Sequence, residues 1–123
     1  MMSENLENIA SRFRNFLPVV IDLETTGFDA KTNAIIQIAM IILGFDSKGN
    51  LSIKFSETRD MAPFAEAIID KSAIEFTGIN VYDPDRKALL ESSALKEVFQ
   101  TIKLETKKTG CKRAILVGHN AHF

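Results

Sequence analysis

The stretch at residues 19–27, which reads VVIDLETTG, decides the predicted fold. It opens with three β-branched residues, a run typical of a buried strand, and the chain is then predicted to turn at residues 26–29. Side chains alternate between the two faces of a strand, so Asp22 and Glu24 share one face and Leu23 takes the other. The stretch therefore predicts a buried strand with two neighbouring carboxylates at its end.

Two further strands are predicted beyond this one. Residues 35–43 form a second apolar and mostly β-branched run, which ends at Gly44. The polar residues 46–50, DSKGN, are typical of a hairpin turn, and residues 51–55 are predicted to return as its second strand. These three runs are expected to lie side by side in one sheet.

The rest of the chain is predicted to be mainly helical. Apolar residues at helical spacing predict helices at residues 3–17, 65–69 and 73–76, and a longer helix that starts near Ser92 or Ser93 and ends by Gly110. Pro18 is expected to end the first helix, and Gly78 to cap the third. Residues 114–117 are predicted to form a fourth strand, which follows a helix and should pair in parallel with an earlier strand. The predicted fold class is therefore α/β, a mixed sheet with flanking helices.

The composition is that of a folded globular domain or of part of one. Apolar residues make up 46% and charged residues 25% of the 123 residues, which argues against a disordered or fibrous chain. Fifteen basic and sixteen acidic residues give a net charge of −1, so any attraction to nucleic acid must come from local clusters. The single cysteine, Cys111, cannot form an internal disulfide, and neither a membrane-spanning run nor a secretory signal is predicted. We therefore expect a cytoplasmic protein with no membrane partner.

The carboxylate pair suggests a metal site. Two carboxylates on one face of a strand repel each other unless a positive charge lies between them, and Mg²⁺ and Mn²⁺ prefer oxygen ligands. For a bare D-x-E pair, surface carboxylates without a ligand are the commoner outcome. The apolar run before Asp22 and the Thr-Thr-Gly after Glu24 favour the metal site here. Phosphatases of the haloacid dehalogenase type carry an acidic pair as D-x-D-x-T, a pattern that this stretch fits poorly.

Three motifs carry a resemblance to a known family. Residues 22–27, DLETTG, resemble the first motif of the DEDD family of 3′→5′ exonucleases, and IIQIA at residues 35–39 resembles the strand that follows it. GHNAHF at residues 118–123 resembles the start of the second motif, an Asn-x-x-Phe that is followed by Asp. The similarity is greatest to the ribonuclease T-like, RNase-H-like subgroup that trims RNA 3′ ends, with agreement at residues 12–14, 27–28, 76–79, 83–86 and 110–114.

The resemblance implies a fold and an activity. It implies an RNase-H-like mixed sheet with flanking helices, with residues 1–123 as the N-terminal part of a single exonuclease domain that would continue into C-terminal helices. The implied activity is hydrolysis at the 3′ ends of tRNA, other stable RNAs and single-stranded DNA, with two Mg²⁺ ions, or Mn²⁺ in their place. These metals would position and activate the attacking water.

Asp22 and Glu24 match the first two of the family's four acidic metal ligands. The third acid would follow Phe123, and the fourth acid and the histidine base belong to a later motif. His119 and His122 are expected to be structural or surface residues rather than that base. We therefore expect the chain to be inactive alone, and the alternative is a non-catalytic homologue that binds single-stranded nucleic acid.

The resemblance also implies substrate contacts, at Thr25, Phe28, Phe76, Asn120 and Phe123. The phenylalanines match positions that stack on the terminal bases. Core packing is the alternative, because a chain with nine phenylalanines and no tryptophan is expected to use most of them in its core. Ser72 stands where the subgroup often carries a glutamate that contacts the bases, which leaves the base preference open.

Basic residues gather near the end of the longer predicted helix, at Lys103, Lys107, Lys108, Lys112 and Arg113. From the residues alone, a solvated helix face is the favoured interpretation. The resemblance favours a second interpretation, because four residues match the basic patch with which one subunit of a homodimer grips the RNA while the other cuts: Arg12, Arg14, Lys107 and Arg113. Such a patch would give salt-sensitive, sequence-independent binding.

Overall fold

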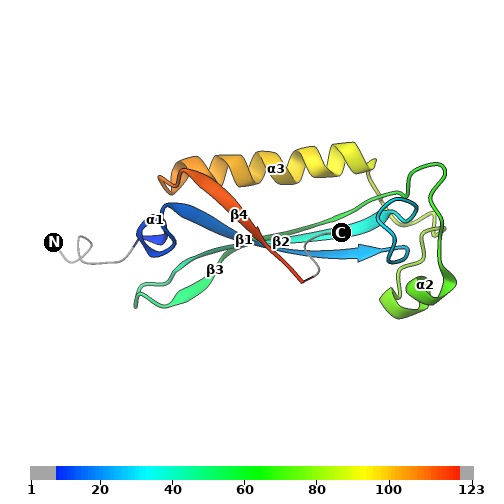
Figure 1. Ribbon diagram of the computed structural model, residues 1–123, viewed down its shortest axis with the longest axis horizontal. Coiled ribbons are helices and arrows are strands. Elements are labelled where there is room, and N and C mark those ends of the chain that lie inside the picture. The colour runs from blue at the N-terminus through cyan, green and yellow to red at the C-terminus, as the bar shows by residue number, and fades with distance from the viewer. Residues whose placement is uncertain (1–7, 120–123) are drawn as a thin grey trace.

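The computed structural model describes residues 8–119, which form a four-stranded sheet with three helices around it (Figure 1). The sheet order is β3-β2-β1-β4, in which β2 is antiparallel to both β1 and β3 and β4 is parallel to β1. The predicted mixed sheet and its parallel fourth strand are confirmed. The elements are α1 (Ile9–Arg12), β1 (Phe16–Thr25), β2 (Ile35–Phe45), β3 (Leu51–Asp60), α2 (Lys71–Thr77), α3 (Glu91–Lys108) and β4 (Arg113–Val117).

The core lies between one face of the sheet and α3, which runs along that face (Figure 1). The helix buries three residues spaced four apart, one stripe of an amphipathic helix: Ala94, Val98 and Ile102. Alternate residues of the two central strands meet this stripe, with Leu17 and Val19 from β1 and Met40 and Ile42 from β2. Removing these side chains from water fixes the register of β1 against β2, because a slip by one residue would turn the apolar set outward.

The β2–β3 hairpin forms as predicted, but its second strand is longer. Asp46 Oδ1 accepts hydrogen bonds from the backbone N–H groups of Lys48 and Asn50, both at 2.9 Å, and Gly49 takes a positive φ of 81°. The predicted strand stops at residue 55, whereas β3 continues to Asp60. Its last residues are mostly polar, as suits an edge strand with solvent beside it, and their sequence therefore lacks the apolar alternation that predicts a strand.

The predicted first helix is wrong over most of its described part. Of the described residues in the predicted range, only those of α1 are helical, and residues 3–7 lie outside the described residues. Arg14 and Asn15 both take positive φ angles, 57° and 70°, which end the helix and redirect the chain into β1. Leu17 and Pro18, predicted as the end of the helix and its terminator, are therefore strand residues, and Pro18 lies opposite Ile115 of β4.

The short helix predicted at residues 65–69 is also wrong. The structure has only a turn there, in which the Ala67 N–H donates to Phe64 O at 3.0 Å. Both backbone polar groups of Ile68 bond instead to the loop that follows β1, which draws the segment away from helical geometry. The other two helices are confirmed: Gly78 caps α2 with a φ of 73°, and α3 starts one or two residues before the predicted serines.

The expectation that most phenylalanines fill the core is wrong for the described part of the chain. No phenylalanine in residues 8–119 is fully buried, and only Phe13 and Phe45 pack against the core from its margin. The space between the sheet and a single helix is filled by aliphatic side chains and methionine. The phenylalanines are left on edges, loops and uncovered faces.

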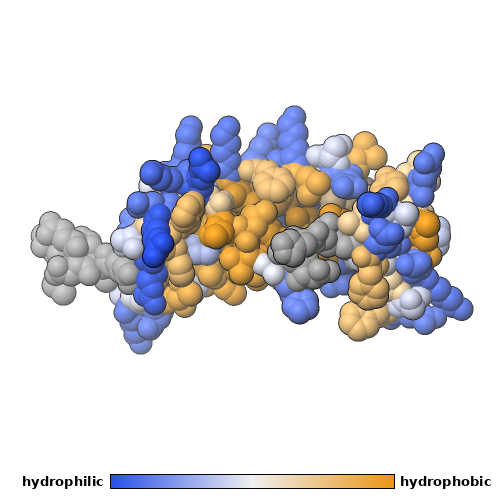
Figure 2. Space-filling view, in the orientation of Figure 1, coloured by the Kyte–Doolittle hydropathy of each residue, from blue (hydrophilic) through white to orange (hydrophobic). Residues whose placement is uncertain are grey.

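The edge strand β4 exposes apolar surface. Ile115, Leu116 and Val117 are each about half exposed, and no strand in the described part of the chain pairs with the outer side of β4. Figure 2 shows hydrophobic side chains gathered in the middle of this view, where β4 crosses in front of the sheet. Unpaired apolar edges favour association with another chain. Within residues 8–119, no helix has the length and apolar character needed to cross a bilayer.

We therefore predict that the chain self-associates through β4. Ile115→Lys should lower the apparent mass of the protein at a given concentration, because a charge on the exposed edge opposes pairing with a second strand. Sedimentation velocity over a concentration series measures this. Leu104→Lys, at a similarly exposed apolar residue of α3, is the matched control. A wild-type chain that is monomeric throughout the series, or a control that lowers the mass equally, contradicts the prediction.

Candidate active site

A cavity of about 480 Å³ opens at the end of β1. Its walls come from three parts of the chain that lie far apart in sequence: the end of β1 with the loop after it, helix α2, and His119 after β4. Five of the sequence-predicted site residues line it, together with Ser72 of α2: Asp22, Glu24, Thr25, Phe28 and Phe76. The structure thus brings together the carboxylate pair and two of the three predicted stacking aromatics.

The pleat of β1 places the carboxylates. Asp22 and Glu24 lie opposite Ala39 and Gln37 of β2, two positions apart on one face of the sheet. The Gln37 side chain donates to Asp60 Oδ1 at 2.9 Å, so its amide is committed elsewhere. Within residues 8–119, neither Asp22 nor Glu24 forms a hydrogen bond or an ion pair through its carboxylate. Both carboxylates therefore keep their oxygen atoms available for a cation in the cavity.

This donor set fits a hard divalent cation in part. Two carboxylates supply oxygen ligands of the kind that Mg²⁺ and Mn²⁺ prefer. In the part of the chain that the structure describes, no three side chains of His, Cys, Asp or Glu are grouped so that they could hold a metal ion. Asp22 and Glu24 therefore provide a partial ligand set, which water or a phosphate oxygen would have to complete.

The two phenylalanines of the cavity are almost fully exposed. Phe28 is 92% exposed in the loop after β1, and Phe76 is 90% exposed on α2. The interpretation of Phe76 as a core residue is therefore wrong. Removing a phenylalanine side chain from water lowers the free energy. Two such exposed rings beside one cavity therefore mark a surface suited to a flat, partly apolar ligand. Ser72 is exposed on α2 and lines the same cavity.

Thr25 takes part in the loop as well as in the cavity wall. Its hydroxyl donates to Gly27 O at 2.7 Å, which closes a tight turn directly after the carboxylate pair. The register between β1 and β2 shifts between Glu24 and Thr25, so the strand pairing is irregular at this point. The irregularity redirects the chain toward the loop that carries Phe28.

The cavity also contains residues that the sequence did not assign to it. Thr77 lies at the end of α2, and His119, expected to be structural or on the surface, is exposed and lines the wall. The topology offers a signal for His119, because it follows a strand parallel to β1 and the ends of parallel strands meet at one edge of a sheet. Asn120, His122 and Phe123 lie outside the described residues.

The four residues of the predicted basic patch lie toward the opposite end of β1. All are exposed, at Arg12 in α1, Arg14 after it, Lys107 in the last turn of α3 and Arg113 at the start of β4. The chain brings these segments together, because Arg113 pairs with Phe16 and the Lys112 N–H donates to Asn15 O at 2.8 Å. From the start of β1 to the carboxylates, the strand spans roughly 25 Å.

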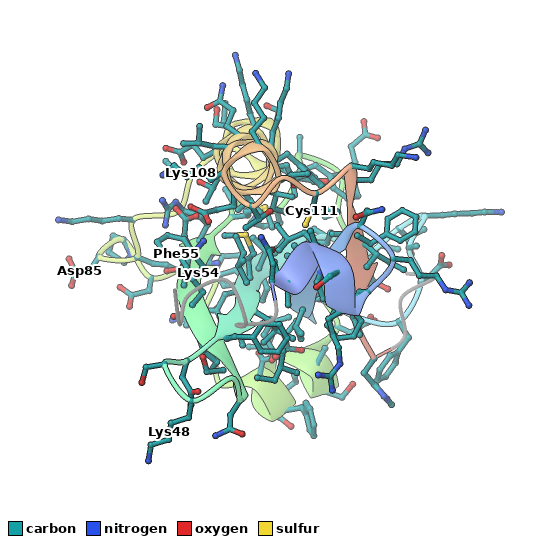
Figure 3. All side chains as sticks on the ribbon, turned by 90° about the vertical axis from the view of Figure 1, so that its left-hand side faces the viewer. Lys48, Lys54, Phe55, Asp85, Lys108 and Cys111 are labelled. Atoms are coloured by element: carbon teal, nitrogen blue, oxygen red, sulfur yellow. The ribbon has the colours of Figure 1, made fainter. Side chains whose placement is uncertain are left out.

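Two neighbouring lysines at this end share one acidic partner. Figure 3 looks onto this end of the molecule and labels Lys54 of β3 and Lys108 of α3. Lys54 Nζ lies 3.1 Å from one carboxylate oxygen of Glu105, and Lys108 Nζ lies 3.7 Å from the other. The Arg12 guanidinium lies over the Phe45 ring, 5.8 Å from its centroid. Two lysines near the patch are therefore partly neutralised by Glu105.

Comparisons with known proteins agree with this arrangement. A family model described as Exonuclease matches residues 19–122. A ribonuclease T from Hahella chejuensis (strain KCTC 2396) is 46% identical over 115 residues, which cover 94% of this chain and 53% of the relative. A ribonuclease T from Escherichia coli (strain K12) is 45% identical over 124 aligned residues, which cover 99% of this chain and 58% of the relative. The chain thus spans little more than half the length of these curated relatives.

Solved structures share the fold. E. coli exonuclease I in complex with a dT13 oligonucleotide superposes with a TM-score of 0.63 at 19% identity, over 85% of this chain and 20% of that chain. A full-length 3′-exonuclease gives a TM-score of 0.62 at 23% identity, over 83% of this chain and 33% of that chain. These matches confirm the predicted RNase-H-like sheet. Because the family model covers most of the residues from β1 onward, this chain belongs to the exonuclease family.

Proposed function

We propose that residues 1–123 are the N-terminal part of a single metal-dependent exonuclease domain that hydrolyses RNA from its 3′ end. The substrates are tRNA and other stable RNAs, and single-stranded DNA is accepted too. The observation that carries the proposal is the cavity at the end of β1, which unites an unpaired carboxylate pair with two exposed aromatic rings in a chain of the exonuclease family. The relatives named ribonuclease T support the choice of RNA.

The residues of the cavity have separate tasks in this proposal. Phe28 and Phe76 stack on the terminal bases, which places the last phosphodiester near the carboxylate end of β1. Stacking tolerates every base because every base has a π face, and Thr25 contributes polar contacts beside the rings. Asp22 and Glu24 hold Mg²⁺, or Mn²⁺ in its place. A divalent ion held there would supply Lewis-acid stabilisation of the charge that develops at the phosphate.

The basic patch supports binding of the nucleic-acid backbone. Arg12, Arg14, Lys107 and Arg113 are exposed at one end of β1, and the carboxylates lie roughly 25 Å away at the other. We propose that the patch holds a backbone segment distant from the cleaved end, with the two tasks divided between the subunits of a homodimer. Contacts of this kind are electrostatic and weaken with salt. A cytoplasmic location stays a prediction from the sequence.

One observation favours a second candidate function. Among residues 8–119 no third acidic, histidine or cysteine side chain joins Asp22 and Glu24 in a group that could hold a metal. A chain that keeps the aromatic wall and the basic patch but cannot cut would be a single-strand-binding homologue. Both candidates require binding through the cavity, and they differ in hydrolysis.

The proposed binding mode predicts that replacing an aromatic residue of the cavity weakens oligonucleotide binding, whereas replacing an exposed aromatic residue outside the cavity does not. Phe28→Ala or Phe76→Ala should weaken binding of a short single-stranded oligonucleotide by roughly five- to a hundredfold, the range expected when one stacked base is lost. Fluorescence anisotropy with an end-labelled RNA measures the affinity. Phe64→Ala is the matched control, because Phe64 is exposed but does not line the cavity. Equal losses in all three variants, or none in the cavity variants, would contradict the proposed binding mode.

Hydrolysis by the chain alone is predicted to be absent. Two carboxylates provide too few ligands to fix a metal and an attacking water together, so purified residues 1–123 should not shorten a labelled single strand when Mg²⁺ is added. Gel electrophoresis over time measures the shortening. Efficient shortening that Asp22→Asn abolishes and Asp85→Asn leaves intact would show that the chain is a complete catalyst, since Asp85 is an exposed aspartate outside the cavity.

A further inference from the structure

Two polar side chains are buried in the described part of the chain, and both lie beside the cavity. Thr26 is fully buried and Asn33 is 4% exposed. A buried polar group costs free energy unless its hydrogen bonds are made, so the partners of these two residues show what they hold in place. Both belong to the loop between β1 and β2, directly after the carboxylate pair.

Their hydrogen bonds reach a segment far along the chain. Thr26 Oγ1 donates to Ile68 O at 2.7 Å, and Asn33 Nδ2 donates to the same oxygen at 2.8 Å. Backbone bonds run beside them, from Ile68 N–H to Thr32 O at 2.8 Å and from Asp70 N–H to Thr26 O at 2.9 Å. The loop after β1 is thus bonded to the residues that lead into α2.

The network also closes within the loop. The Ala34 N–H donates to Thr26 Oγ1 at 2.9 Å, and Asn33 Oδ1 accepts from the Asp29 N–H at 2.8 Å. The Thr26 hydroxyl therefore both donates and accepts, and Asn33 uses both ends of its amide. Neither polar side chain is available for a ligand, so the role of Thr26 and Asn33 in the site is structural.

Helix α2 depends on this network more than on packing. It carries Ser72 and Phe76 of the cavity wall, yet none of its seven residues is buried. Asp70, its N-cap, makes no side-chain bond to the helix, and its Oδ2 accepts instead from Asn33 Nδ2 at 3.3 Å. A helix without buried side chains has little apolar area to fix its position. The hydrogen bonds that Ile68 and Asp70, just before α2, make with the loop after β1 therefore determine where Phe76 lies.

Gly27 shows how closely the loop approaches the network. A Cβ atom placed at this residue would lie 2.1 Å from Asp70 Oδ2 and 2.5 Å from the Asn33 side chain. Both neighbours are committed to the hydrogen bonds described above, so the backbone at Gly27 passes through a space that a side chain cannot share. An added Cβ atom must displace the Asp70 and Asn33 side chains.

We propose that Thr26 and Asn33 are positioning residues that hold α2, and with it Phe76, at a fixed distance from Asp22 and Glu24. The functional importance of that distance rests on the proposed exonuclease site, whereas the distance itself is a property of the fold. A hydrogen-bond network of this kind lets a helix with no buried residue form one wall of a cavity whose other wall belongs to the sheet.

The test compares two substitutions at the same residue. Thr26→Val keeps the shape of the side chain and removes the hydroxyl, whereas Thr26→Ser keeps the hydroxyl. Nitroxide labels on cysteines introduced by Ser56→Cys in β3 and Glu75→Cys in α2 report the distance between sheet and helix, in a full chain whose native thiol is removed by Cys111→Ala. Both labelled residues are exposed. Pulsed electron paramagnetic resonance then measures the distance distribution.

Thr26→Val should widen that distribution at least about twofold, because Ile68 in the segment leading into α2 loses a hydrogen bond to the loop and the Ala34 N–H loses its acceptor. Thr26→Ser, which keeps the hydroxyl, should leave the distance distribution as narrow as in the wild-type chain. Gly27→Ala, whose Cβ atom would displace the Asp70 and Asn33 side chains, should widen the distribution as well. Val98→Ala, which destabilises the α3 core without touching the network, should leave it narrow. An unchanged width in Thr26→Val, or equal widening in Val98→Ala, overturns the proposal.

Oligonucleotide affinity separates this inference from the proposed function. If both hold, Thr26→Val weakens binding of the short single strand about tenfold and Thr26→Ser does not, because a displaced Phe76 loses its stacking contact. If the distance distribution widens as expected while the wild-type chain binds no oligonucleotide, the positioning of α2 stands and the proposed function is overturned.

Discussion

The alternation of side chains along β1 is the constraint on which the rest of the structure depends. Odd-numbered residues from Leu17 to Leu23 face the core under α3, so the even-numbered positions must face the other way, and Asp22 and Glu24 come to lie side by side there. Burying the apolar set fixes the register, and the register holds two like charges together. The same strand pairs with β4 on its other side, which brings His119 to the cavity.

Much of this could be predicted from the sequence because local patterns and tertiary packing agree. The run before Asp22, the DSKGN turn and the i, i+4 spacing of Val98 and Ile102 each predict the element that forms. The pattern failed where a tertiary contact decides the outcome. Leu17 has helical spacing to the residues before it, but β4 offers its segment a strand partner, and the two residues before Phe16 adopt positive φ angles that no periodicity reveals.

The candidate site could likewise be predicted only in part from the sequence. Asp22, Glu24 and Phe28 follow one another in a short motif, so their proximity could be predicted from the local sequence. The approach of α2 cannot be read from the local sequence, because it depends on hydrogen bonds between residues 26–33 and 68–70, which join positions up to 44 apart. The exposure of Phe76 likewise follows from the absence of buried residues in α2, which helical spacing with Ala73 could not disclose.

The central claim is that the cavity at the end of β1 binds a divalent cation through Asp22 and Glu24. Titration of the isotopically labelled chain with Mn²⁺, followed by paramagnetic broadening of its amide resonances, tests that claim directly. We predict selective broadening at residues 22–28, in α2 and at His119, and its loss when Asp22→Asn is combined with Glu24→Gln. Broadening that lies elsewhere on the molecule, or that persists in the double variant, would contradict the account.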